Sequence, residues 1–304
     1  MSETLIELSQ VTKSFDGRPV LSDFSFQVRR GEIAGLLGPN GSGKTTTIRL
    51  INGVIRPDAG SIRVNGYDAA HDGDAIRAAS GILTESAAFY VHMTGLQNLQ
   101  FYAKLYGVTE AGRAGELLAE FGLLDAATRK VGTYSTGMKK RLGLAKALLH
   151  RPEILFLDEP TNGLDPEGIR MVLEAIVSLN RRDGTTMILC SHLLAQLERV
   201  CHRYLFLDGG RLIEQGTLAE LEAKYLTDIS LEVETDLPLT GETYRSVPAR
   251  RLSTNRIEFT LPGKQAVPAL LRQLSAEASV YTAAVTGQDL ESIYFKIREV
   301  AHHE

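Results

Sequence analysis

One glycine-rich segment constrains the fold of this chain more than any other feature. It lies between an apolar run at residues 32–37, which predicts a buried strand, and residues 45–51, which predict a helix. A strand, a glycine loop and a helix in that order are typical of an α/β fold. The segment consists of Gly38, Pro39, Asn40, Gly41, Ser42, Gly43, Lys44 and Thr45.

This segment fits the pattern of a phosphate-binding loop. Glycines let backbone N–H groups converge on phosphate oxygens without Cβ clashes, and the helix that starts near Lys44 adds its positive dipole end. We expect Lys44 to reach the β- and γ-phosphates of a nucleotide and the Thr45 hydroxyl to ligate Mg²⁺. The alternative is a chance glycine turn, which the flanking strand and helix argue against.

Two carboxylates follow a second apolar run at residues 154–157. A strand there would place Asp158 and Glu159 at the C-terminal edge of the sheet, where α/β proteins bind ligands. We expect Asp158 to hold Mg²⁺ through water. Glu159 would face the γ-phosphate and orient or deprotonate the attacking water. The alternative is a strand that ends in a solvated acidic turn.

A third candidate site lies before that strand, at the start of a helix predicted over residues 136–150. Ser135 and Gly137 offer a hydroxyl and a backbone N–H there, which is anion-binding geometry. The alternative is a serine N-cap followed by a basic exposed face at residues 139–141. In isolation the serine N-cap is the stronger interpretation. Only the order of this motif among the other motifs of the chain favours anion binding.

Two further patterns define the organisation of the chain. Residues 5–28 predict β-structure with a tight turn at Asp16-Gly17, and residues 92–150 are mostly helical, with a capping box formed by Thr94 and Gln97. Further strands are expected at residues 185–190 and 204–207, a helix at 193–200, alternating strands at 229–234 and 256–261, and helices at 265–276 and 289–300.

The composition is that of an ordinary globular protein. A length of 304 residues suggests two domains, and 43% hydrophobic with 23% charged residues excludes disorder, collagen and small disulfide scaffolds. The net charge of −4 gives no reason to expect nucleic acid or an anionic membrane surface as a partner. Cys190 lies in an apolar run, which predicts a buried free thiol in a reducing compartment.

Nothing in the sequence predicts membrane insertion or secretion. No apolar run approaches the ~18 residues of a membrane span, and the acidic N-terminus lacks the features of a signal peptide. We therefore expect a cytosolic protein, and any membrane-spanning part would come from another chain.

The motifs, in their order, resemble the ATP-binding subunit of ABC transporters. After the phosphate loop come YSTGM at residues 134–138, LFLDEPT at 155–161, GLDP at 163–166 and Ser-His at 191–192. The resemblance covers about residues 4–220, and five ordered motifs make it specific.

The resemblance implies a fold and a domain organisation. The fold class would be α/β, a P-loop ABC ATPase domain at residues 1–226 with a RecA-like core, an antiparallel β subdomain and a helical subdomain at about 86–150. Residues 227–304, read from their own pattern as a small α+β domain, resemble the appended domain of some bacterial ABC exporter ATPases. A regulatory or dimer-bracing role for that domain is a hypothesis.

The resemblance also implies residue roles, with ATP and Mg²⁺ as cofactors. Glu159 would be the general base, and His192 resembles the switch histidine that contacts the γ-phosphate, although a lone histidine there could be a helix cap. Phe15 matches the aromatic residue that stacks on adenine, with a core phenylalanine as the alternative. The implied nucleotide-binding residues are Phe15, Gly38, Pro39, Asn40, Gly41, Ser42, Gly43, Lys44, Thr45, Thr46, Ser135, Gly137 and Asp165.

A dimer follows from the same resemblance. In the family, the positions of Ser135 and Gly137 contact the ATP that the opposite subunit binds, and Asp165 resembles a residue that communicates across the dimer. An N-cap role of Asp165 before Pro166 is compatible with this. One chain carries one loop and one signature, so a homodimer or a dimer with a related ATPase subunit is implied.

Two departures from the family pattern stand out. The signature usually reads Leu-Ser-Gly-Gly-Gln, and its first, third and fifth positions here are Tyr134, Thr136 and Met138. The glutamine that usually touches Mg²⁺ aligns with Glu85, whose carboxylate can also ligate the metal but adds a charge. Both departures resemble exporter ATPases that pair with separately encoded permeases.

The resemblance thus implies the ATPase subunit of an exporter of drugs, antibiotics or polysaccharides, held on the cytoplasmic face of the membrane by its permease, with no nucleic acid partner. Residues 89–93 are a candidate docking patch, with core packing as the alternative. Two rivals are a non-transport ABC ATPase switch and a P-loop kinase of a small molecule. The sequence does not reveal the cargo.

Overall fold

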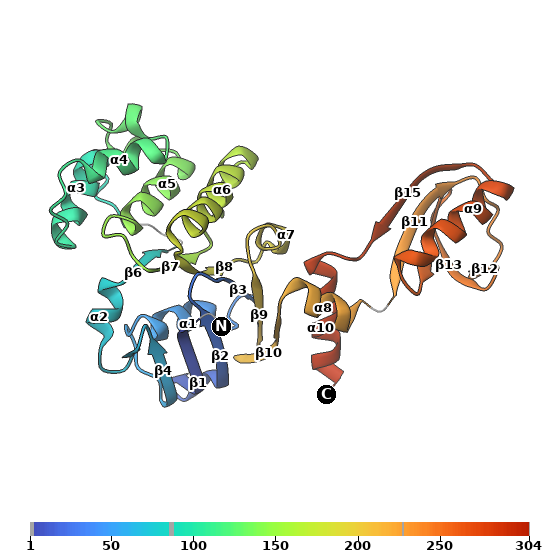
Figure 1. Cartoon of the computed structure of the whole chain (residues 1–304), viewed down its shortest axis with the longest axis horizontal. Helices are drawn as coiled ribbons and strands as arrows, with labels where there is room; N and C mark the ends of the chain where they lie inside the picture. The colour runs from blue at the N-terminus through green and yellow to red at the C-terminus, as the bar shows by residue number, and fades with distance from the viewer. Residues whose placement is uncertain (1–2, 85–87, 227, 304) are drawn as a thin grey trace. The chain divides into compact units, whose positions relative to one another are not determined.

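The computed structural model describes residues 3–84, 88–226 and 228–303 (Figure 1). The chain divides into two compact units, Met1–Gln215 and Gly216–Glu304. This division assigns helix α8 (Leu218–Tyr225) to the second unit, where the Lys296 ammonium donates to the Tyr225 carbonyl. The sequence-based domain boundary after residue 226 stays a prediction.

A six-stranded sheet forms the centre of the first unit. Its order is β10-β9-β3-β8-β7-β6. The neighbouring strands from β9 through β3, β8 and β7 to β6 are all paired in parallel. The strands are β3 (Ile33–Leu37), β6 (Ser80–Leu83), β7 (Ile154–Asp158), β8 (Thr186–Cys190), β9 (Arg203–Asp208) and β10 (Arg211–Gly216). Every residue of β3 and β8 is buried, which is why these strands are continuous apolar runs in the sequence.

A second, antiparallel sheet has the order β2-β1-β4-β5. Its strands are β1 (Thr4–Phe15), β2 (Arg18–Arg29), β4 (Ala59–Val64) and β5 (Tyr67–Asp68). The turn predicted at Asp16-Gly17 joins β1 to β2, and both residues have positive φ angles, as a two-residue hairpin turn requires. Strands β4, β5 and β6 are not among the strands predicted from the sequence.

The first unit contains seven α-helices among the described residues, and the longer ones follow the predicted order. They are α1 (Lys44–Ile51), α2 (Gly73–Ala78), α3 (Gly95–Leu105), α4 (Arg113–Glu120), α5 (Thr136–Ala147), α6 (Pro166–Asp183) and α7 (Leu194–Leu197). Helix α5 ends three residues before the predicted position. Helix α7 is shorter than the predicted 193–200, because Arg199 and Val200 make i→i−3 hydrogen bonds instead of extending the α-helix.

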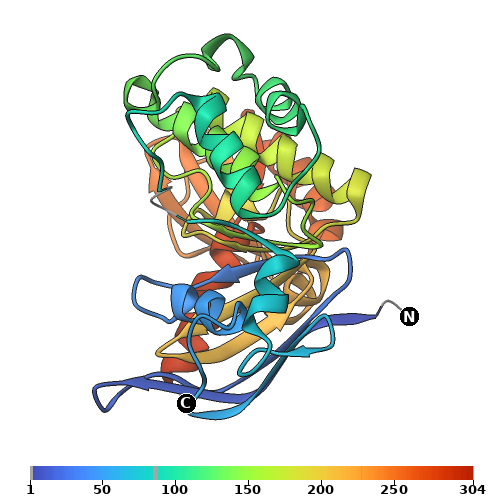
Figure 2. The same ribbon diagram turned by 90° about the vertical axis from the view of Figure 1, so that its left-hand side faces the viewer.

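The core of the first unit lies between the two sheets. Apolar side chains of β1 and β2 pack in one cluster with those of β3, β7, β8 and β9, and Ile48, Leu50 and Ile51 of α1 join it. Figures 1 and 2 show the helices α3 to α6 on the other side of the parallel sheet from β1 and β2. The start of α1, which the glycine-rich loop connects to β3, is therefore held at the edge of the parallel sheet.

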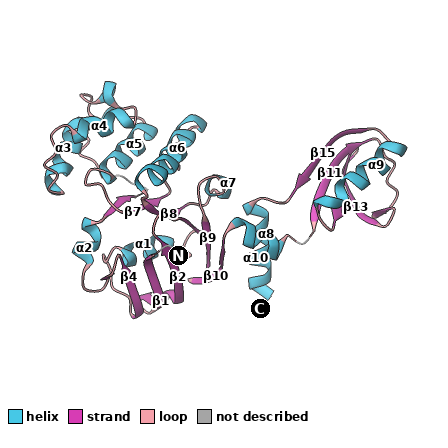
Figure 3. Ribbon diagram, in the orientation of Figure 1, coloured by secondary structure: helices cyan, strands magenta, loops and turns pink. Residues whose placement is uncertain are grey.

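The second unit has its own sheet and core. The order is β12-β13-β14-β11-β15, and α9 (Val267–Glu277) buries Leu270 and Leu274 against the sheet (Figure 3). The strands are β11 (Ile229–Thr235), β12 (Thr243–Tyr244), β13 (Val247–Ser253), β14 (Arg256–Leu261) and β15 (Val280–Thr286), and the last helix is α10 (Leu290–His303). No described helix is both long and apolar enough to cross a membrane.

The capping box predicted at the start of α3 is present, and it generates a stability prediction. The Thr94 hydroxyl accepts from the Gln97 N–H at 3.1 Å, and Gln97 Oε1 accepts from the Thr94 N–H at 2.9 Å. Thr94→Ala removes one partner and should weaken α3 by about 1 kcal/mol. Hydrogen exchange over residues 95–105 measures this, with the exposed Thr109→Ala as control. Unchanged protection would contradict the role of the box.

Candidate functional site

The glycine-rich loop connects β3 to α1 as predicted. Two of its glycines are required by the close approach of other parts of the chain: a Cβ on Gly38 would lie 2.3 Å from the Leu207 carbonyl oxygen, and one on Gly43 would lie 2.7 Å from Leu21 Cδ2. Gly43 also has a φ of +109°, which an L side chain rarely adopts. The loop can therefore place its backbone N–H groups around an anion at the start of a helix.

Lys44 lies inside this loop. Its residue is only 8% exposed, and its ammonium donates to the carbonyls of Gly38 at 2.7 Å and Pro39 at 3.0 Å. A buried ammonium held by two neutral carbonyls lacks a compensating negative charge in these contacts. An anion that enters the loop would therefore form a strong charge-assisted hydrogen bond with the Lys44 ammonium.

A cavity of about 360 Å³ opens beside the loop. Asp158, the last residue of β7, and Glu159, directly after it, also line this cavity, and the Thr45 hydroxyl donates to Asp158 Oδ2 at 3.2 Å. These two oxygens are of the hard kind that Mg²⁺ prefers. The cavity is lined by Val20, Asn40, Gly41, Gly43, Lys44, Thr45, Thr46, Asp158 and Glu159.

Glu159 has the most constrained environment of the predicted site residues. Its backbone has a φ of +49°, and its N–H donates to the Cys190 carbonyl at 2.9 Å. His192 Nδ1 lies 3.0 Å from Glu159 Oε1, although the two residues are 33 positions apart in the chain. Glu159 Oε2 is buried and has no hydrogen-bond partner in the part of the chain that the structure describes.

His192 is not a helix cap. Helix α7 begins two residues later, with Leu193 as its N-cap, and half of the His192 side chain is exposed. The segment that follows β8 carries the ring to the same sheet edge as Glu159. The structure therefore excludes the helix-cap alternative and leaves a contact with Glu159.

Ser135 and Asp165 lie together, but in a different cavity, of about 560 Å³. The Ser135 hydroxyl accepts from the Met138 N–H at 3.2 Å, and Asp165 Oδ1 accepts from the Gly168 N–H at 2.8 Å, so both are helix N-caps. Gly137 lines the same cavity. These residues do not line the phosphate-loop cavity, so the structure brings the predicted residues together in two groups.

Phe15 stands apart from both groups, and Glu85 cannot be compared with them. Phe15 ends β1 and is 43% exposed, with the Lys13 ammonium 5.3 Å from its ring centre, so it is not a core phenylalanine. Glu85 lies outside the described residues. Its neighbour Thr84 lines a further cavity of about 440 Å³ with Thr45 and Asp158.

The unusual tyrosine of the signature is a core residue. Tyr134 is 4% exposed, and its hydroxyl donates to the Ala126 carbonyl at 2.7 Å. A Cβ on Gly95 would lie 2.2 Å from that hydroxyl. Tyr134 thus anchors the segment before α5 to the helical part of the unit.

Lys140 argues against the alternative of a basic exposed face at residues 139–141. The residue is 5% exposed, and its ammonium donates to the Glu159 carbonyl at 2.9 Å. Helical spacing is the sequence pattern that indicates this burial. Lys140, Leu144 and Ala147 lie on one face of α5, and all three are buried.

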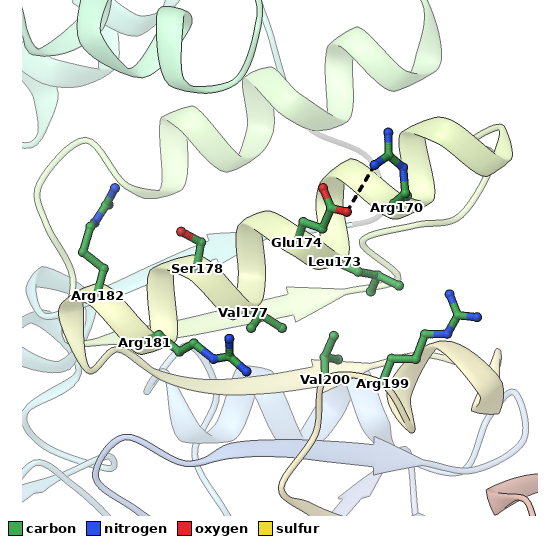
Figure 4. A pocket seen from close by; sticks show the side chains of 9 residues that line it. All are labelled: Arg170, Leu173, Glu174, Val177, Ser178, Arg181, Arg182, Arg199 and Val200. Carbon is green, nitrogen blue, oxygen red and sulfur yellow. Dashed lines mark hydrogen bonds and ion pairs between the residues drawn. The ribbon is translucent and has the colours of Figure 1, made fainter.

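A larger cavity, of about 750 Å³, lies along α6 and contains none of the predicted site residues (Figure 4). Leu173, Val177 and Val200 form its apolar part, and arginines surround it. Among these, Arg170 pairs with Glu174, and Arg182 pairs with Asp183 and Glu120. It offers no loop of converging N–H groups, so the smaller cavity beside Lys44 is the better candidate for nucleotide.

Comparison with known proteins agrees with this geometry. Residues 21–162 match the model of the ABC transporter family. The chain is 36% identical over 297 residues to the ABC transporter ATP-binding protein YhcH of Bacillus subtilis, which covers 97% of this chain and 96% of the relative. It is 40% identical over 227 residues to the daunorubicin resistance ATP-binding protein DrrA3 of Streptomyces coeruleorubidus, covering 74% and 72%.

A solved structure of an ATP-binding subunit of an ABC transporter superposes with a TM-score of 0.66 at 33% identity, covering 73% of this chain and 93% of that one. The fold class predicted from the sequence, a P-loop ABC ATPase, is confirmed. The chain belongs to the ATP-binding proteins of ABC transporters, and it is an ATPase.

Proposed function

We propose that this ATPase powers a membrane exporter and that the cavity beside Lys44 binds its MgATP. The observation that carries the proposal is that a buried ammonium lies at the same sheet edge as a buried carboxylate oxygen with no hydrogen-bond partner among the described residues. In this assignment the loop N–H groups and Lys44 hold the phosphates. Phe15, which is exposed at the end of its strand, stacks on the adenine.

The oxygen donors in the cavity fit a magnesium ion. Thr45 Oγ1 and Asp158 Oδ2 are 3.2 Å apart and would hold Mg²⁺ directly or through water, and the ion would neutralise charge on the phosphates. Glu85 stays a predicted further ligand. Phosphate oxygens of the nucleotide and water would complete the coordination of the ion.

Glu159 acts as the general base in this proposal. Its Oε1 is occupied by His192, so the carboxylate is oriented with Oε2 free to accept a hydrogen bond from the attacking water. His192, which is half exposed, can also reach toward the γ-phosphate. The two side chains together position the water and sense the presence of the γ-phosphate.

The separation of the two cavities supports a composite site. Ser135 and Gly137 lie at a helix start, away from the phosphate loop of the same chain. The N-cap role of Ser135 uses its lone pairs, and its hydroxyl hydrogen remains available to an anion. A second ATPase subunit would present this helix start to the ATP held by the first, and Asp165 would lie at the same contact.

A surface on the helical segment fits a permease. Within residues 89–93, Tyr90 is 41% and Val91 56% exposed, which argues against core packing. Leu105 on α3 is 66% exposed, and Phe101 packs edge-to-face on Tyr90. Exposed apolar groups gathered in this way mark an interaction site. We assign it to a separately encoded permease, which would hold the subunit at the cytoplasmic face of the membrane.

The relative DrrA3 carries daunorubicin resistance in its name, which supports export of drug-like molecules. A non-transport switch remains the first rival, and crosslinking from Tyr90 to a co-purified membrane protein would separate the two. A small-molecule kinase, the second rival, leaves Ser135 and His192 without a role. No observed feature favours nucleic acid as a partner.

Removal of the base gives the first test of the mechanism. Glu159→Gln keeps the shape of the side chain but cannot accept the proton, so ATP binding should persist while hydrolysis slows by about 10²–10⁴-fold. Single-turnover measurements report the rate. Glu174→Gln, an exposed carboxylate on α6, is the matched control. Turnover of E159Q at the wild-type rate would refute the role of Glu159.

Removal of the loop lysine tests the binding site. Lys44→Ala deletes a charge-assisted contact worth roughly 1.5–3 kcal/mol, so nucleotide affinity should fall by about 10- to 100-fold. Calorimetric titration with ATP measures the change, and the exposed Lys130→Ala serves as control. Equal affinities of K44A and wild type would contradict the assignment of the cavity.

Assembly of the composite site can be tested on its own. The E159Q protein with MgATP should sediment as a dimer, alone or with its permease. Gly137→Glu should abolish this, because it brings a carboxylate to the phosphates. A Cβ fits at Gly137, where the nearest atom is 3.6 Å away. Gly115→Glu, where a Cβ meets nothing within 4 Å, is the matched control. If the E159Q protein with MgATP were strictly monomeric both alone and with its permease, the composite site would be ruled out.

A further inference from the structure

A buried lysine holds the backbone of Glu159. Lys140 is 5% exposed in the middle of α5, and its ammonium donates to the Glu159 carbonyl at 2.9 Å. A charged group in a protein interior is costly unless it is hydrogen-bonded, so this contact is a substantial part of what keeps the ammonium there. None of the roles assigned above uses Lys140.

The carbonyl that Lys140 contacts begins a tight turn. It also accepts from the Asn162 N–H at 3.3 Å, and Pro160 stands at the second position of the turn, where proline is favoured. Glu159 itself has a φ of +49°, a conformation that is strained for any residue other than glycine. Such a conformation persists only where surrounding contacts fix it. Here one contact comes from β8, through the Cys190 carbonyl, and another from Lys140.

Helix α5 connects this contact to the second cavity. Ser135 is the N-cap of α5, and Lys140 follows five residues later on the same rigid element. The first turn of the helix therefore lies at the cavity that contains Ser135, Gly137 and Asp165. Lys140, in the middle of the helix, contacts the backbone of Glu159, the proposed base. A shift of α5 would be transmitted to the Glu159 backbone through the hydrogen bond from Lys140.

We propose that Lys140 is a positioning residue for hydrolysis, which fixes the left-handed backbone of Glu159 and links the signature helix to the base. Lys140 does not touch the nucleotide. It acts by keeping the Glu159 carboxylate aimed into the phosphate-loop cavity, with Oε1 on His192 and Oε2 free. This inference rests on the proposed role of Glu159 as the base.

The position of Lys140 predicts a kinetic signature. A positioning residue lowers kcat when it is lost, because the base is misplaced, but leaves nucleotide binding intact. Its loss should have no further effect once the base has been removed. A lysine that merely stabilises the fold would lower the rate by the same factor in both backgrounds.

The experiment compares Lys140→Met with wild type and with the pair E159Q and K140M/E159Q, using the full chain. K140M removes the donor and keeps an unbranched side chain. We expect kcat to fall by about 10- to 100-fold, the cost of misplacing a catalytic group, with the KM for ATP within about twofold. The single-turnover rates of E159Q and K140M/E159Q should agree. Lys139→Met, the partly exposed neighbour, should behave as wild type.

Each other result overturns the proposal. A K140M kcat within twofold of wild type, a raised KM with unchanged kcat, or an equal loss in both backgrounds would each show that Lys140 does not act through the base. Circular dichroism and thermal unfolding establish that the variants are folded. If K140M does not fold, Lys140→Leu, which is shorter and also lacks a donor, is measured by the same criteria.

Failure of the proposed function remains distinguishable. The comparison of E159Q with wild type tests the proposed function, because turnover of E159Q at the wild-type rate would show that Glu159 is not the base. K140M in the wild-type background tests the present inference. An unchanged kcat of K140M would show that Lys140 does not position the base, and the role of Glu159 would be unaffected.

Discussion

Parallel backbone pairing of three strands is the constraint on which the site depends. Strands β3, β8 and β7 are neighbours, and the register pairs Leu36 with Cys190 and Cys190 with Asp158. Since parallel strands end at the same edge, the segments that follow them meet there. The glycine loop follows β3, Glu159 follows β7 and His192 follows β8. A shift of one residue in either pairing would turn these side chains to the wrong face.

Much of this arrangement could be predicted from the sequence because its causes are local. The burial of β3 and β7 on both faces makes them continuous apolar runs, and the caps at Thr94 and Asp165 are satisfied by groups three residues away. The hairpin at Asp16-Gly17 has the same local origin. In each case a short stretch of chain contains the interaction that decides its conformation.

The remainder depends on partners that are distant in the chain. Lys140 could not be distinguished by residue type from Lys139 and Arg141, which are only partly buried, because its ammonium is held by a carbonyl 19 residues away. Strand β4 is mostly exposed and carries only two buried positions, Ile62 and Val64, so its pattern is weak. Similarly, the positive φ of Glu159 follows from contacts with β8 and α5 rather than from its own sequence.

The burial of Cys190, expected from its apolar run, has a consequence for the chemistry of this sheet edge. The residue is fully buried, and burial in this apolar setting, together with the nearby carboxylates, raises the pKa of its thiol well above the usual value. Only a thiolate attacks alkylating agents or is readily oxidised. The Cys190 thiol, at the sheet edge that carries Asp158 and Glu159, is therefore unreactive, and peroxide or maleimide would leave it unmodified.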